Sequence, residues 1–169
     1  VTFCGGEPLS HPSDLVALLD RCGALGIHRA VDTTLFASPD TVRSVMERTD
    51  LFLVDLKHMD SGSHCRFTGV PNERILSNLR MIAEAGIDFL IRIPLIEGVN
   101  ADEENISRSA IFLASCRGSG KSLISSRTTT SEKVSTISEE PSTIPGTFRY
   151  PPLPKQSCKG VSINSPPAG

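Results

Sequence analysis

Charged side chains follow the apolar runs of this sequence at regular intervals. Glu7 comes after the first run, Asp32 ends the second, Asp55 and Lys57 end the third, and Arg92 lies within the fourth. If these runs are parallel strands, their carboxyl ends meet at one edge of a sheet, where α/β proteins bind ligands. The alternative is that the carboxylates only cap the following helices. Polar groups at the same end of four successive runs favour a ligand site.

The turn after the first run is Cys4-Gly5-Gly6-Glu7-Pro8. Two adjacent glycines allow the backbone to come close to a ligand, because neither carries a side chain. The carboxylate of Glu7 can accept hydrogen bonds from a cationic amine. This turn is therefore a candidate ligand-binding loop.

The cysteines show no CxxC or CxxxC spacing; they are Cys4, Cys22, Cys65, Cys116 and Cys158. An odd number without close pairs argues against a disulfide framework and for a reducing compartment. No set of zinc or iron–sulfur ligands is visible among them. We expect each cysteine to pack as a small buried hydrophobic residue.

Length and charge exclude several classes of protein. The chain has 169 residues and a formal net charge of −2, which leaves no basic footprint for nucleic acid. It contains neither a run of about 18 apolar residues nor a charged-then-apolar leader, so we expect a cytoplasmic protein without membrane contact. The first residues resemble a strand and lack an initiator Met, which predicts a fragment.

Strands and helices alternate along the first part of the chain. Four strands are expected over residues 1–3, 28–33, 51–57 and 89–96. Amphipathic helices are expected after residues that can cap them, namely Ser13, Ser38, Asn72 and Asp102. Apolar strands that alternate with amphipathic helices indicate an α/β fold with a parallel sheet.

Composition changes sharply near Cys116. Residues 1–116 contain 40 Ile, Leu, Val, Met and Phe, whereas residues 117–169 contain nine, together with seven of the 12 prolines. So little apolar surface cannot offset the entropy lost on folding. We therefore predict a core domain over residues 1–116 and a disordered tail over residues 117–169 that contributes no functional site.

Four segments carry a resemblance to a known family. Phe3–Pro8 (FCGGEP) resembles the GGEP segment of radical S-adenosylmethionine (SAM) enzymes. Three further segments are similar to the activating proteins of glycyl radical enzymes, the pyruvate formate-lyase activating enzyme family: Ala30–Thr34 (AVDTT), Val54–Asp60 (VDLKHMD) and Ile91–Asn100 (IRIPLIEGVN). The resemblance covers residues 1–116 and implies a partial (β/α) radical-SAM barrel of about four parallel strands.

The resemblance implies a cofactor site and an activity. Gly5, Gly6 and Glu7 would hold the amino group of SAM, Asp55 and Lys57 would contact its methionine and ribose parts, and Asp32 and Arg92 would complete the site. Asp32, Thr33, Asp55 and the carbonyl of Leu53 would bind a monovalent cation. The implied activity is reductive cleavage of SAM to a 5′-deoxyadenosyl radical, which abstracts hydrogen from a glycine of a partner enzyme.

The family also implies partners and a metal cofactor. Its members use a 4Fe-4S cluster and an electron donor of the flavodoxin or ferredoxin type, and they activate a glycyl radical enzyme. Three cysteines of a CxxxCxxC loop hold the cluster, and these ligands are absent from this chain. We therefore expect this polypeptide alone to be inactive.

The sequence after Ala114 departs from the family, which continues with HLLPYH and a GExKY segment. Codons for Tyr-His-His-Phe-Gly-Glu-Ser-Lys-Tyr, shifted by one base, encode Thr-Thr-Thr-Ser-Glu-Lys-Val-Ser-Thr, the sequence of residues 128–136. We interpret the tail as the product of a frameshift between about residues 114 and 122. Resequencing the gene tests this interpretation.

Three alternatives remain open at this stage. A different radical-SAM enzyme, such as an anaerobic ribonucleotide reductase activase, would share GGEP but not the later segments. A non-radical α/β enzyme would use Asp55 and Lys57 as acid and base. A non-enzymatic, truncated remnant would bind no cofactor productively.

Overall fold

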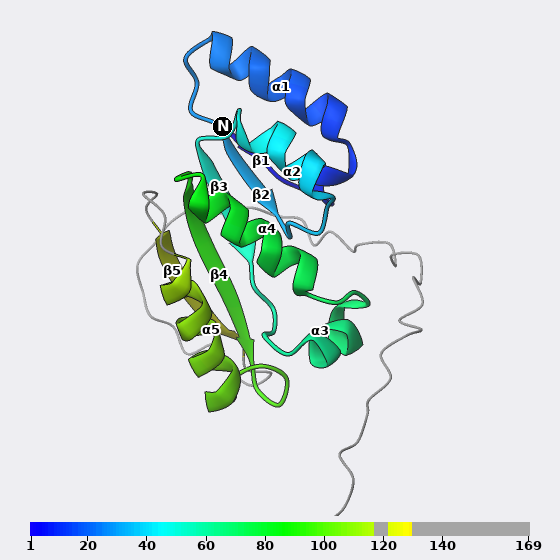
Figure 1. The fold of residues 1–169 in the computed structure, drawn as a ribbon, viewed down its shortest axis with the longest axis vertical. Helices are drawn as coiled ribbons and strands as arrows, with labels where there is room; N and C mark the ends of the chain where they lie inside the picture. Colours follow the sequence, from blue (N-terminus) through cyan, green and yellow to red (C-terminus); the bar gives the residue numbers. More distant parts are fainter. Residues whose placement is uncertain (117–121, 130–169) are drawn as a thin grey trace, which may run out of the picture.

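The chain folds around a parallel sheet (Figure 1). A computed structural model describes residues 1–116 and 122–129. Within them the strand order follows the sequence, and every pairing is parallel. The strands are β1 (Thr2–Phe3), β2 (Ala30–Thr33), β3 (Leu51–Asp55), β4 (Asp88–Ile96) and β5 (Ser122–Thr129). The predicted α/β fold, a partial barrel of parallel strands, is confirmed.

Helices connect successive strands and lie along one face of the sheet. They are α1 (Pro12–Ala24), α2 (Pro39–Met46), α3 (Ser61–Thr68), α4 (Glu73–Glu84) and α5 (Glu103–Ser115), preceded by the short 3-10 helix η1 (Pro8–Ser10). Crossovers between adjacent parallel strands are right-handed, which places successive helices on the same side. Figure 1 shows α3 beyond the carboxyl end of β3. No helix in the described part of the chain is long and apolar enough to span a membrane.

Alternation along the strands separates a core face from a site face. On β3, Phe52 and Val54 are fully buried against the helices, whereas Leu53 and Asp55 are half-buried on the opposite face. Because successive side chains point to opposite faces, strand pairing extends both sets across the sheet. Val31 of β2 and Ile91 of β4 extend the core face of the sheet. The helices contribute fully buried side chains to the same core, namely Leu19, Val42, Leu79 and Ile82. The site face is thus left to polar residues at the strand ends.

Three of the four predicted helix starts are correct, and one is wrong. The side chains of Ser38 and Asp102 each accept a hydrogen bond from a backbone N–H of the first turn, as expected for caps. Helix α1 begins at Pro12 after His11, without a side-chain cap, so Ser13 lies inside the helix. Asn72 occupies the position before α4 as predicted, but its side chain makes no capping bond there; its Nδ2 donates to the carbonyl of His58.

The structure differs from the predicted disordered tail over one stretch. Residues Ser122–Thr129 form β5, which pairs along its whole length with β4 from Phe89 to Ile96. The open edge of β4 offers unpaired N–H and C=O groups, and a segment with Leu, Ile and Thr can satisfy them. The rest of the predicted tail, and Cys158 with it, lies outside the described residues.

An ion pair joins the residues that directly precede β2 and β3, at the amino ends of these strands. The backbone N–H and Nε of Arg29 donate to Oδ2 of Asp50 at 2.7 and 2.9 Å, and Nη2 donates to Oδ1 at 2.8 Å. The hydrogen bonds from the Arg29 side chain lower the pKa of Asp50 to about 2 and outweigh the opposing effect of burial. Ionised Asp50 therefore stabilises the fold.

Replacing Asp50 with asparagine is expected to lower the free energy of unfolding by about 1 kcal/mol at pH 7, a small value because the Asp50 side chain is 34% exposed to solvent. Because its pKa is depressed in the folded state, the contribution of Asp50 is complete above its ordinary pKa of 3.8 and is lost as pH falls towards about 2. Thermal unfolding of both proteins between pH 7 and pH 2 measures this. A difference in melting temperature that stays constant with pH would contradict it.

Candidate functional site

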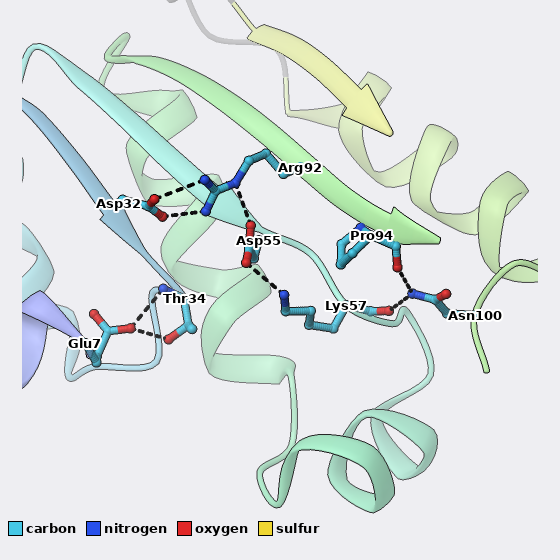
Figure 2. Close-up of polar contacts among 8 residues, drawn as sticks. All are labelled: Glu7, Asp32, Thr34, Asp55, Lys57, Arg92, Pro94 and Asn100. Atoms are coloured by element: carbon cyan, nitrogen blue, oxygen red, sulfur yellow. Dashed lines mark hydrogen bonds and ion pairs between the residues drawn. The ribbon is translucent and has the colours of Figure 1, made fainter. Parts of the chain in front are cut away.

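Four charged side chains form a continuous chain across the carboxyl ends of β2 and β3 and the middle of β4 (Figure 2). The guanidinium of Arg92 donates to both carboxylate oxygens of Asp32, at 3.0 and 2.5 Å. Its Nε donates to Oδ1 of Asp55 at 2.7 Å, and Nζ of Lys57 donates to Oδ2 of the same carboxylate at 2.8 Å. The two positive and two negative groups balance, so the charges compensate one another without a ligand.

Strand register explains why these side chains meet. Asp55 pairs directly with Arg92, and Asp32 pairs with Leu53, two residues before Asp55. Positions two apart share a face, so all three charged residues lie on the site face. Burial opposes the charge of Arg92, but hydrogen bonds to Asp32 and Asp55 outweigh it and raise the pKa of the guanidinium. Arg92 therefore stays protonated at every physiological pH.

Glu7 uses both carboxylate oxygens within the protein. Oε1 accepts from the N–H of Leu9 at 3.0 Å and from the hydroxyl of Thr33 at 2.5 Å. Oε2 accepts from the N–H and the hydroxyl of Thr34 at 2.9 and 2.6 Å (Figure 2). Because a carboxylate offers about four acceptor positions, Glu7 is saturated. Its visible role is to hold the turn after β2 against the turn after β1.

The backbone at Gly5 and Gly6 is open. Both glycines have left-handed φ values, +93° and +56°, and both are exposed. A Cβ atom at either position would meet no other atom within 4 Å. The requirement for glycine is therefore conformational, and the space in front of this turn is available to a ligand. These observations leave room for a ligand at the turn after β1.

The predicted monovalent-cation site stays a prediction. The positive charge between Asp32 and Asp55 is the Arg92 guanidinium. The hydroxyl of Thr33 is buried, donates to Glu7 and accepts from the N–H of Leu35, so it is turned away from both aspartates. A cation bound by both aspartates would have to share their oxygens with Arg92.

The described residues do not fit an iron–sulfur cluster. Over residues 1–116 and 122–129, no group of three or more His, Cys, Asp or Glu side chains is placed to hold a metal ion. Cys4 is exposed, which corrects the expectation that it packs as a buried hydrophobic residue, whereas Cys116 is buried as expected. We therefore derive no chemical step through a cluster from this chain.

Sequence reasoning missed two features beside the site. Leu35 is fully buried with a φ of +60°, a strained value for a side chain of this size, and Asn78 donates to its carbonyl at 2.9 Å. A hollow of about 300 Å³ lies next to Lys57 and is also lined by Phe67 and Asn100, among others. In the sequence, the hollow is signalled by the Gly-Val-Asn segment after β4, because Val99 and Asn100 line it.

Comparison with known proteins identifies the family. The Radical SAM superfamily model matches residues 1–110. The chain belongs to this superfamily. The match includes both glycines of the open turn and every member of the chain of charges.

Curated relatives narrow the comparison to activating enzymes. The chain is 41% identical over 107 residues to the trans-4-hydroxy-L-proline dehydratase activating enzyme of Clostridioides difficile, covering 63% of this chain and 35% of that protein. It is 43% identical over 106 residues to the choline trimethylamine-lyase activating enzyme of Oleidesulfovibrio alaskensis, covering 63% of this chain and 34% of that protein. The chain thus spans about a third of the length of these relatives.

Solved structures agree with the fold. A domain of pyruvate-formate lyase-activating enzyme from Bacteroides vulgatus is 62% identical, with a TM-score of 0.65 over 70% of this chain and 74% of that domain. SuiB of Streptococcus suis is 20% identical, with a TM-score of 0.62 over 78% of this chain and 30% of that protein, and supports the fold alone. The predicted resemblance to radical-SAM activating proteins is confirmed.

Proposed function

We propose that this chain is the SAM-binding part of a protein that activates a glycyl radical enzyme. The observation that carries the proposal is the chain of charges from Asp32 to Lys57 beside the open turn at Gly5 and Gly6. The site occurs in a superfamily named for SAM, and the similar curated proteins are activating enzymes.

Each side chain has a definite task in this proposal. The Lys57 ammonium has three N–H groups and uses one on Asp55, so two are free for the carboxylate of SAM. Asp55 accepts one bond at each oxygen and can accept further bonds from ribose hydroxyls. Arg92 holds Asp55 in place and supplies positive charge for the carboxylate of SAM. The site thus recognises the charged and hydroxyl-bearing parts of SAM.

The amino group of SAM would bind at the turn after β1. Because Glu7 is saturated, the ammonium must replace one of its present donors. We propose that it replaces the Thr34 hydroxyl on Oε2, since that bond is exposed and can be exchanged without disturbing the backbone. The N–H of Thr34 would keep its bond to the same oxygen. Glu7 then both holds the turn and neutralises the ammonium.

SAM bound at this site would supply the radical chemistry of the superfamily, and the electron that this chemistry needs would have to come from outside the described residues. The protein positions the cofactor and complements its charge. We propose that the cluster ligands, the electron donor and any monovalent cation are supplied outside the described residues or by binding partners. The residues described here account for cofactor recognition only.

An anaerobic experiment tests this function. The 169-residue chain and the same chain joined to a CxxxCxxC segment from a relative are treated with iron and sulfide, then given SAM and dithionite. We expect cluster-level iron and 5′-deoxyadenosine only with the joined protein. A joined protein that holds its cluster yet forms no 5′-deoxyadenosine would contradict the proposal.

A further inference from the structure

Asn100, in the turn after β4, is buried, and its side-chain amide makes three hydrogen bonds to the backbone, two of them drawn in Figure 2. Its Nδ2 donates to the carbonyl of Lys57 at 2.7 Å and to that of Pro94 at 2.9 Å. Its Oδ1 accepts from the N–H of Ile96 at 2.7 Å. A single amide therefore joins the end of β4 to the segment that follows β3.

Two further buried amides hold the neighbouring residues of the same segment. Oδ1 of Asn105 accepts from the N–H of Met59 at 2.8 Å, and its Nδ2 donates to the carbonyl of Asn100 at 2.9 Å. Nδ2 of Asn72 donates to the carbonyl of His58 at 2.8 Å. Three asparagines thus bind three successive backbone positions after β3.

This arrangement has a consequence for the chain of charges. Residues 57–59 lie between β3 and α3, outside helix and strand, so their backbone groups lack the partners that regular structure provides. Fixing the carbonyl of Lys57 fixes the point from which its side chain starts. From that point the ammonium reaches Asp55 at 2.8 Å. On the other strand, the same amide holds Pro94, two residues after Arg92.

We propose that Asn100 is a positioning residue, which holds the Lys57–Met59 segment so that the Lys57 ammonium stands at the cofactor site. The inference rests on the proposed function for its effect on SAM, but the hold on the segment is independent of any cofactor. Asn105 supports Asn100 because its Nδ2 donates to the backbone carbonyl of Asn100. A purely structural role would instead lower stability without acting through Lys57.

Two variants and a matched control separate these roles. Asn100→Ala removes all three bonds, and Asn100→Ser is a milder variant in case the alanine protein does not fold. Thr49→Ala is the control, because the Thr49 hydroxyl is also buried and donates to a backbone carbonyl, that of Val45 at 2.9 Å, away from the strand ends. We expect all three proteins to melt at lower temperature than the parent chain.

The first measurement needs no cofactor. Amide hydrogen exchange of the full 169-residue chain is followed by NMR at Met59, whose N–H is bound by Asn105. We expect exchange at Met59 to accelerate on the order of tenfold in both Asn100 variants and to stay unchanged in Thr49→Ala. Unchanged exchange at Met59 in both Asn100 variants would overturn the proposal.

The second measurement is SAM affinity, by equilibrium dialysis of the chain joined to a cluster-binding segment. We expect Asn100→Ala to weaken binding on the order of tenfold, and to weaken it less than about twofold when Lys57→Ala is already present, because the two residues act together. An equal loss with and without Lys57 would overturn the proposal. If the parent protein fails to bind SAM, the proposed function fails, and hydrogen exchange still decides the role of Asn100.

Discussion

Replacing Asp55 with asparagine is expected to weaken SAM binding on the order of a hundredfold. Asp55 accepts from Arg92 and from Lys57, one at each oxygen. An asparagine keeps one acceptor oxygen and turns an NH₂ group towards either Arg92 or Lys57. It therefore loses its hydrogen bond to that cation, and the bond to the other cation is weakened because the side chain is no longer charged. A hydrogen bond to a charged group contributes about 1.5–3 kcal/mol, which corresponds to this loss. Equilibrium dialysis with the cluster-loaded protein measures it.

Asp50→Asn is the matched control for this experiment. Asp50 directly precedes β3 and Asp55 ends it, and each carboxylate is bound by an arginine of a neighbouring segment. Both variants lose an ion pair, but only Asp55 lies at the proposed site. We expect Asp50→Asn to bind SAM like the parent protein. Equal SAM affinity in the Asp55→Asn variant and the parent would place the cofactor elsewhere.

Replacing Arg92 with alanine is expected to destabilise the fold by about 2 kcal/mol. The guanidinium lies between Asp32 and Asp55, whose side chains are 23% and 26% exposed. Without it, half-buried Asp32 loses its ion-pair partner, and Asp55 keeps only Lys57. The figure is at the low end for a broken ion pair because Arg92 itself is 38% exposed and solvent screens the remaining charges. Chemical denaturation at pH 7 measures the change.

The Arg92→Ala variant also tests the predicted monovalent cation. If Asp32 and Asp55 can bind such an ion, potassium should restore part of the lost stability, whereas tetramethylammonium at equal ionic strength should not. The comparison removes general screening, which both salts provide equally. Identical unfolding curves in the two salts would argue against a cation site at these carboxylates.

The gathering of charges at one edge of the sheet could be predicted from the sequence. Glu7, Asp32, Asp55 and Arg92 each stand at a defined place relative to an apolar run, and parallel strands end together. Which charge binds which could not be predicted, because it depends on register. Arg92 stands beside Asp55 and reaches Asp32 only because β3 and β4 pair as they do.

The partners of Glu7 were beyond sequence reasoning for a different reason. They depend on the turn after β2, where Leu35 adopts a positive φ and its N–H binds the hydroxyl of Thr33. Nothing in the local pattern predicts a buried leucine in that conformation. Similarly, Asn72 begins α4 as predicted, but its bond to the carbonyl of His58 depends on tertiary structure and could not be predicted from its position.

The tail shows the limit of composition as a guide. Few apolar residues and seven prolines after residue 116 argue against a second core. A single strand needs no core of its own when it adds to an existing sheet, and β5 does so along β4. A pattern judged in isolation could not reveal this pairing, because the unpaired edge of β4 belongs to the preceding domain.

The central claim is that SAM binds at the carboxyl ends of β1 to β4. A crystal structure of the chain joined to a cluster-binding segment, grown anaerobically with SAM, tests it most directly. We expect the methionine part beside Gly5 and Gly6, its carboxylate within hydrogen-bonding distance of the Lys57 ammonium, and Asp55 within reach of the ribose. SAM bound away from this edge, with the ion pairs of Arg92 and Lys57 untouched, would contradict the account.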